Sequence, residues 1–426
     1  MVQRISVHNN LPRKDAPSGE EIPGRWSVLT AAPHRVMFLL GVSQIVLAML
    51  WWIADLSGRY AGWYAAPQWS VPPLYAHAFL MIYAVFPLFV FGFAMTAMPN
   101  WTKGAVQRTS WVTTGILFAV GIVLLYAGLF VHAYLVGLGV LVFLGAWLTG
   151  WSALLKLVIG NRAKDKHALG IVSVLAIGAV GVSLFAISLF TGDWLYADFA
   201  RRMGIWLFLL PLFMVVSHRL VPFFSSRIIQ NYVMYRPTGS LALLFVGCGG
   251  HFLLDWFGLY GWTWLVDFPM AIWVAYLALR WGLAHSFRAR LLAMLHTSLV
   301  ALAVGLALYG LASLLALFGY PGVLGHAPLH ALAIGYFAAK TLGMVSRVSL
   351  GHSGRALEAD PITWRCFQAV LLVAFVRVLS ELSFVPQGLR TVLLILSAVG
   401  WLAVFIPWSL SYAPIYLRPR ADGKAG

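Results

Sequence analysis

Long apolar runs alternate with short polar or Gly/Pro-rich segments along most of this chain. An α-helix needs about 20 apolar residues to cross roughly 30 Å of hydrocarbon. Such runs occupy twelve segments, at residues 36–54, 76–98, 111–129, 132–155, 168–190, 203–223, 239–257, 262–282, 289–317, 329–349, 364–386 and 390–411. The two-residue alternation of a membrane β-barrel is absent, and lipid cannot satisfy an unpaired backbone. We therefore predict about twelve transmembrane helices.

Composition assigns the chain to the same class. Of its 426 residues, 61% are hydrophobic and only 10% are charged, and the mean hydropathy is +0.85. A soluble chain keeps about a quarter of its residues charged, so this sequence is predicted to be an all-α integral membrane protein. We expect a single twelve-helix membrane domain at 26–417, a disordered cytoplasmic tail at 1–25 and a second cytoplasmic tail at 418–426.

The net charge of +16 is distributed as membrane topology requires, rather than as a nucleic-acid surface. Basic residues in cytoplasmic loops set the orientation of a membrane protein. They gather in both tails and in every second loop, at Arg4, Arg13, Lys14, Arg25, Arg35, Lys103, Arg108, Lys156, Arg162, Lys164, Lys166, Arg227, Arg236, Arg280, Arg288, Arg290, Arg355, Arg365, Arg418, Arg420 and Lys424. The opposite loops hold Arg59, Arg201, Arg202 and Arg390. We predict that both termini are cytoplasmic and that no nucleic acid is bound.

The tenth apolar run concentrates candidate chemistry at both of its ends. His326 and His330 precede or open it on the predicted outer side, and Arg347, His352 and Arg355 close it on the cytoplasmic side. Imidazole is a common ligand of haem iron and copper, and Arg pairs well with a carboxylate such as a haem propionate. Because about 30 Å separates the two ends, we predict an outer site near His330 and an inner site near Arg347 and His352.

Two further histidines lie where a metal ligand could act. His77 opens the second run on the outer side, where an interfacial histidine without a metal is an equal alternative. His296 stands inside the ninth run, where ionisable groups are costly and usually face a partner. A neutral histidine bonded to a backbone carbonyl is its alternative. We expect His77 and His326 to join the outer site, and His296 the inner one.

Three other charged residues fall within apolar runs. Arg377 and Glu381 are four residues apart, so they share a helix face and are predicted to pair with each other. Lys340 has no acidic residue near it in sequence and needs an acceptor elsewhere. Either a bound anion, such as a haem propionate, or a backbone carbonyl would serve. The two cysteines, Cys248 and Cys366, lie in apolar runs and offer no disulfide framework.

These residues resemble the signature of the NnrS family. The matching stretches are His330-Ala-Leu-Ala-Ile-Gly-Tyr, Thr341-Leu-Gly-Met-Val-Ser-Arg347-Val-Ser-Leu-Gly-His352-Ser-Gly-Arg355, Gly92-Phe-Ala-Met-Thr-Ala-Met-Pro99-Asn-Trp-Thr102, Arg219-Leu-Val-Pro222-Phe-Phe224 and His296 with Gly305. They follow the family's order across most of the chain.

The resemblance implies a twelve-span protein of the bacterial inner membrane that binds haem, with b-type expected, and copper. It also implies a role in nitric oxide or nitrosative stress and in denitrification. The family's histidines correspond to His77, His296, His330 and His352, and its arginines to Arg347 and Arg355. The metal ligands are then expected among His77, His326, His330 and His296.

Two departures from the family pattern bear on metal content. Where the family has His-x-His-Glu-Met in the second run, this chain keeps His77 and Met81 but carries Phe79 and Leu80. His218 stands where a glycine is expected. If the replaced residues bind or tune a metal, that metal is lost, altered or completed here by His326.

The leading hypothesis is a membrane protein that binds haem, with copper as a second candidate metal, and whose ligand is nitric oxide or another small diatomic molecule. Whether it is an enzyme, and what donates electrons, stay open. A proton-coupled transporter of an anion or metal is the alternative, with Pro87, Pro211 and Pro222 breaking spans as transporters do. A haem-copper oxidase-like enzyme is a third, although the paired histidine spacing that it needs is absent.

Overall fold

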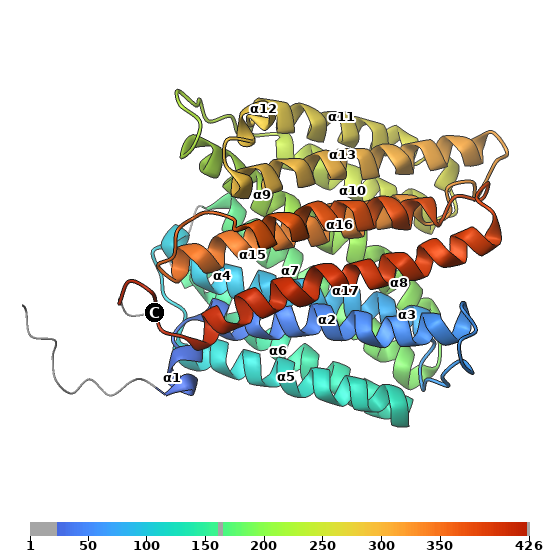
Figure 1. The fold of residues 1–426 in the computed structure, drawn as a ribbon, viewed down its shortest axis with the longest axis horizontal. Coiled ribbons are helices and arrows are strands. Elements are labelled where there is room, and N and C mark those ends of the chain that lie inside the picture. The colour runs from blue at the N-terminus through green and yellow to red at the C-terminus, as the bar shows by residue number, and fades with distance from the viewer. Residues whose placement is uncertain (1–23, 161–164, 424–426) are drawn as a thin grey trace, which may run out of the picture.

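All secondary structure in the computed structural model is helical over the residues that it describes, 24–160 and 165–423 (Figure 1). The predicted all-α class is confirmed. The tail predicted at 1–25 lies almost entirely outside the described residues, as does the end of the tail predicted at 418–426.

Nine helical segments in the described ranges are long and apolar enough to cross a membrane. They are α2 (Pro33–Arg59), α3–η1–α4 (Pro73–Thr102), α5 (Arg108–Val131), α6 (Ala133–Gly160), α7 (Lys166–Thr191), α8–η2–α9 (Leu195–Ser226), α13 (Arg290–Leu317), α16 (Pro361–Leu379) and α17 (Gln387–Leu417). Each coincides with one of the predicted runs. The chain is a multi-pass membrane protein.

The other three predicted runs are also helical, at the expected places. Two of them, α10 (Ser240–Trp256) and α11 (Trp264–Arg280), have 17 residues each, slightly below the usual length of a span. The third consists of α14 (Ala327–His330), η4 (Ala331–Ala338) and α15 (Ala339–His352). Its polar residues, Lys340 and Arg347 among them, lower its hydropathy. The count of twelve spans and the position of both termini therefore stay predictions.

The long helices run side by side along one axis of the molecule (Figure 1). Short helices α1 (Arg25–Leu29), η3 (Tyr260–Trp262) and α12 (Leu283–Ser286) lie in or beside the connections. The first and last long helices are neighbours, because the Trp401 indole donates to the Ile45 carbonyl at 3.0 Å and Ser409 donates to the Val42 carbonyl at 2.9 Å. Arg35 also donates to the Arg418 carbonyl at 2.8 Å. The chain ends thus close the bundle.

Glycines allow α5 and α6 to approach until their backbones touch. A Cβ atom at Gly128 would lie 2.3 Å from the Val136 nitrogen, and one at Gly139 would lie 2.6 Å from the Leu125 nitrogen. Small residues are the usual means of packing helices in lipid, where the hydrophobic effect does not drive association. The two glycines therefore fix this helix pair.

Three helices contain a π-helical segment, in which the backbone hydrogen bonds widen to i→i+5. These segments are η1 (Leu80–Val85), η2 (Gly204–Leu209) and η4. Pro87 and Pro211 follow two of them and lack the N–H that an α-helix would use, so the preceding carbonyls must find other donors. Such bulges occur frequently at functional sites.

Replacing Gly128 by Ala should destabilise the protein by about 1–3 kcal/mol, since the added methyl group meets rigid backbone. Gly145→Ala, on α6, is the matched control because nothing lies within 4 Å of its Cβ position. Thermal unfolding of the two variants in detergent would measure the difference. Equal stability of both variants would contradict the close approach of α5 and α6.

Candidate functional site

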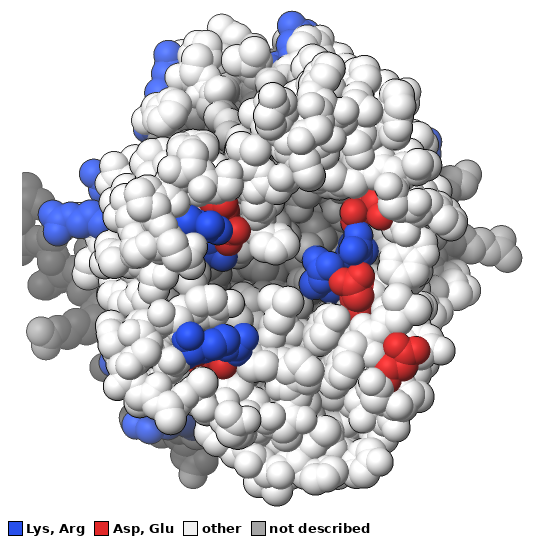
Figure 2. Space-filling model, turned by 90° about the vertical axis from the view of Figure 1, so that its right-hand side faces the viewer, with Lys and Arg blue, Asp and Glu red and all other residues white. Residues whose placement is uncertain are grey.

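The end of the bundle opposite the C-terminus is hollowed, with charged side chains of both signs around the hollow (Figure 2). A cavity of about 540 Å³ opens there, here termed the outer cavity because it contains residues of the predicted outer site. Its wall comes from α2, α16, α17 and the three helices that contain π segments. Most of the lining is apolar, with Trp52, Met81, Phe86, Phe337 and Trp401 among it. This volume and lining are typical of a cofactor site.

Three of the predicted ligands line this one cavity: His77 from α3, His326 from the loop before α14, and His330 at the end of α14. The structure therefore assembles the residues that the sequence assigns to the outer site. Within the described residues there is no cluster of three His, Cys, Asp or Glu side chains placed to hold a metal ion.

His77 is held by its neighbour on α2. Its ring stacks on Trp52 with the ring centroids 4.0 Å apart and the planes 13° from parallel. Its Nδ1 atom is buried and has no hydrogen-bond partner among the described residues. A buried polar atom of this kind needs an explanation, and an unassigned ligand is one.

A hydrogen bond to the backbone just before its own helix orients the His330 side chain. Its Nδ1–H donates to the His326 carbonyl at 3.0 Å, and Nδ1 lies 3.9 Å from the Glu381 carboxylate. This bond leaves Nε2 as the nitrogen that can accept a ligand. The arrangement is the one that metal-binding histidines usually have, with the second ring nitrogen fixed by a carbonyl or carboxylate.

Glu381 connects the helices around His330. It pairs with Arg377 at 2.5 Å, as the sequence predicts, and also accepts from the His326 backbone N–H at 3.0 Å. The loop approaches so closely that a Cβ atom on Gly325 would lie 2.8 Å from Glu381. Sequence spacing predicted the local pair but not this second contact across 55 positions.

Four arginines lie in the wall of the cavity: Arg59, Arg201, Arg377 and Arg390. Arg59 pairs with Asp55, whereas Arg390 bonds to the Ser380 carbonyl at 3.2 Å and the Gln387 side chain at 3.4 Å. Within the described residues Arg390 has no acidic partner. Sequence reasoning missed Arg59 and Arg390 as site residues, although basic residues are rare on the predicted outer side.

The residues that depart from the family pattern lie outside this cavity wall. Phe79 is buried and stacks on Phe185 of α7, with ring centroids 4.4 Å apart. Leu80 is buried at the start of η1. Neither residue lines the cavity.

The predicted inner residues lie in separate surroundings. His296 is fully buried, and its Nε2 lies 3.0 Å from the Ser225 hydroxyl of α9. Lys340 donates to the Leu295 carbonyl at 3.0 Å, which is one of its two predicted partners. Arg347 stacks over the Phe224 ring at 4.0 Å.

The C-terminal end of α15 contacts the start of α2 instead. The ring of His352 lies against that of His34, with centroids 4.9 Å apart, and Arg355 follows in the next loop. No hydrogen bond, ion pair or ring contact joins His296 to His352 within the described residues. The inner residues thus do not form a site comparable with the outer cavity.

The chain was also compared with known proteins. The family model described as "NnrS protein" matches residues 28–420, which is most of the chain. A search of curated proteins found no match. The match covers every residue of the outer cavity and all four signature histidines. The chain therefore belongs to the NnrS family.

Proposed function

We propose that this protein binds haem in the outer cavity, with His77 and His330 as its ligands. One observation carries the proposal: imidazoles from two helices that are distant in sequence face one largely apolar cavity, and each has a ring nitrogen without a hydrogen bond within the described residues. Neutral imidazole is the commonest metal ligand among side chains, and histidine holds the haem iron in globins and peroxidases.

The polar residues of the wall suit the rest of a haem. Its propionates need cationic partners near water, and Arg59, Arg377 and Arg390 line the cavity close to the open end of the bundle. Arg390 is the first candidate, because its guanidinium has no acidic partner in the described part of the chain. Arg–carboxylate pairs are among the stronger hydrogen-bonded contacts.

We propose nitric oxide or another diatomic molecule as the ligand of the site, in agreement with the role that family membership implies in nitrosative stress and denitrification. Haem supplies an iron that binds such gases when it is present. The protein contributes fixed imidazoles and an apolar wall that limits the entry of water. A nonpolar gas reaches this wall through the bundle without a polar channel.

Copper, where it is bound, is proposed for the same region. His326 lines the cavity beside His330 and is the third imidazole there. Copper accepts imidazole nitrogen readily, so His326 would supply a ligand to it while His77 and His330 hold the haem.

We further propose twelve spans in the bacterial inner membrane with both termini in the cytoplasm. The helices α10, α11 and α14–η4–α15 run alongside the nine longer segments (Figure 1). Loops at the end where α17 finishes carry most of the described basic residues, and the hollowed end carries few, which supports this orientation.

Replacing His330 or His77 by Ala should abolish or strongly reduce the Soret absorption of protein purified from haem-replete cells, because each change removes one residue proposed to hold the haem iron. His132→Ala is the matched control. His132 is exposed at the same end of the bundle and lies outside the cavity. Iron and copper analysis would accompany the spectra. Stoichiometric absence of both metals from the wild-type protein would contradict the proposal and favour the transporter alternative.

His296→Ala should leave the Soret band in place while lowering thermal stability. This histidine is packed against Ser225 and lines none of the outer cavity. Loss of the band in His296→Ala, with retention in His330→Ala, would move the haem to the interior of the bundle. The unfolding midpoint and the absorbance ratio of the same samples measure both effects.

Thiol labelling tests the orientation in a background with Cys248 and Cys366 replaced. A membrane-impermeant reagent should modify Phe384→Cys in intact cells but modify Val233→Cys only after permeabilisation. Both positions are highly exposed, at 73% and 84%, and lie in loops at opposite ends of the bundle. The reverse labelling pattern would place the termini outside.

A further inference from the structure

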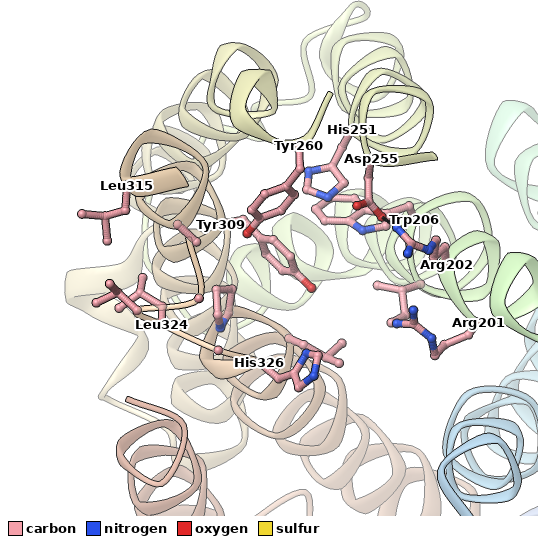
Figure 3. A pocket seen from close by; sticks show the side chains of 17 residues that line it. Arg201, Arg202, Trp206, His251, Asp255, Tyr260, Tyr309, Leu315, Leu324 and His326 are labelled. Atoms are coloured by element: carbon pink, nitrogen blue, oxygen red, sulfur yellow. Dashed lines mark hydrogen bonds and ion pairs between the residues drawn. The ribbon is translucent and has the colours of Figure 1, made fainter. Parts of the chain in front are cut away.

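A second cavity, of about 260 Å³, adjoins the first at the hollowed end (Figure 3). It lies among α8–η2, α10, α13 and the loop that leads into α14. Arg201, Ile205, His326 and Leu329 line both cavities, so the two share a wall. Nothing in the haem proposal uses the polar groups of this second cavity.

Its innermost polar group is a buried pair formed by His251 of α10 and Asp267 of α11. The His251 Nδ1–H donates to the Asp267 carboxylate at 2.7 Å, and the two side chains are 1% and 0% exposed. A charge this deeply buried is retained only with a partner, and in a membrane protein it marks a functional site by default. Trp206 stacks on the imidazole, with centroids 3.4 Å apart, and fixes its plane.

The orientation of His251 presents its second nitrogen to the cavity. Because Nδ1 is bonded to Asp267, Nε2 is the atom left for a ligand, and His251 is part of the cavity lining. When the ring carries both protons, Nε2 is a hydrogen-bond donor that a bound anion can accept from.

Two tyrosines add hydroxyl groups to the same wall (Figure 3). Tyr309 packs edge-on against both Trp206 and His251, with centroid distances of 5.0 and 5.1 Å. Burial, with Asp267 and Asp255 nearby, raises the pKa of Tyr260 to about 12. Its hydroxyl therefore remains protonated and able to donate at neutral pH.

Two guanidinium groups complete the lining. Arg202 bridges two carboxylates, Asp198 at 2.9 Å and Asp255 at 2.5 Å. Arg201 bonds to Asp198 through Nε and one terminal nitrogen, at 3.2 and 2.5 Å. Its other terminal nitrogen makes no hydrogen bond within the described residues. Figure 3 shows Arg201 across the cavity from Tyr309.

Donors therefore exceed acceptors in this cavity. The one carboxylate in its lining, Asp255, is already committed to Arg202. Arg201 carries a positive charge and has a terminal nitrogen without a hydrogen bond among the described residues, and the hydroxyls of Tyr260 and Tyr309 can donate. We propose that this cavity binds a small planar oxyanion, of the size of formate or nitrate, held by Arg201, His251 and Tyr309.

A planar oxyanion matches these groups in shape as well as in charge. Arg201, His251 and Tyr309 come from three helices, so separate oxygens of a planar oxyanion can each accept from a different group, whereas a halide offers a single acceptor atom. The shared wall places the anion next to His326 and the outer cavity. The anion site does not require haem, so either proposal can fail without the other.

Thermal unfolding of the purified full-length protein would test this site. Sodium formate or sodium nitrate would be titrated at constant ionic strength, with sodium chloride as the balancing salt. Binding to the folded state should raise the unfolding midpoint in a saturable manner. Arg201→Gln and His251→Gln should each weaken the apparent affinity by about tenfold or more, since each removes one of the polar groups proposed to hold the anion.

Two further variants distinguish a specific site from general effects of salt. Tyr309→Phe keeps the ring and removes one donor, so it should weaken binding without unfolding the protein. Arg227→Gln removes one positive charge at the opposite end, where Arg227 stacks over Phe223 at 5.1 Å, and should leave the response unchanged. The midpoint of each variant in chloride alone reports whether it folds.

Three results would overturn the proposal. The first is a wild-type response that is absent or does not saturate with either oxyanion. The second is an equal loss in Arg227→Gln and Arg201→Gln, which would indicate a general charge effect. The third is an apparent affinity for the oxyanion that stays unchanged both in Tyr309→Phe and in one of the variants Arg201→Gln and His251→Gln, with all of these proteins folded.

Discussion

Lipid provides no hydrogen-bond partner for the backbone, and the rest of this structure depends on that constraint. Every peptide group within the bundle must be satisfied by the chain itself, which makes continuous helices the default. The departures from the α-helical pattern are therefore informative. The π segments η1, η2 and η4 lie in three helices, and all three helices line the outer cavity. Irregular backbone is tolerated in a membrane where protein or a cavity surrounds it.

Charge is distributed under the same constraint. The hollowed end has few basic residues, yet Arg59, Arg201 and Arg390 all line the outer cavity, and Arg201 and Arg202 line the smaller one. Most of them are paired with an acidic residue from the same end of the bundle. Pairing lowers the cost of holding a guanidinium near hydrocarbon. It also fixes the position of each guanidinium relative to the neighbouring histidines.

Hydropathy predicted the helices well because it records burial in lipid, which depends on local composition. The run predicted at 168–190 is observed at Lys166–Thr191, and that predicted at 289–317 is observed at Arg290–Leu317. The Arg377–Glu381 pair was equally accessible, because one helical turn brings the two residues together.

Contacts between helices that are far apart in the sequence leave no comparable pattern in the sequence. No local pattern predicted the bond from His326 to Glu381, the contact between the rings of His352 and His34, or the wall that the two cavities share. Pro87 and Pro211 could have indicated two of the π segments, since each removes an N–H from the helix. No proline follows η4, and its widened backbone was not predictable from a local rule.

The position of Phe79 decides how the departure from the family pattern is interpreted. A residue that replaces a metal-binding side chain would be expected to line the cavity that holds the metal. Phe79 instead stacks on Phe185 within the core, and it also contacts Tyr83 and Phe143 edge-on or at an angle. A histidine there would need a polar partner among aromatic rings. The substitution thus favours packing of the end of α3 against α6 and α7, while His77 and His330 keep their places in the outer cavity.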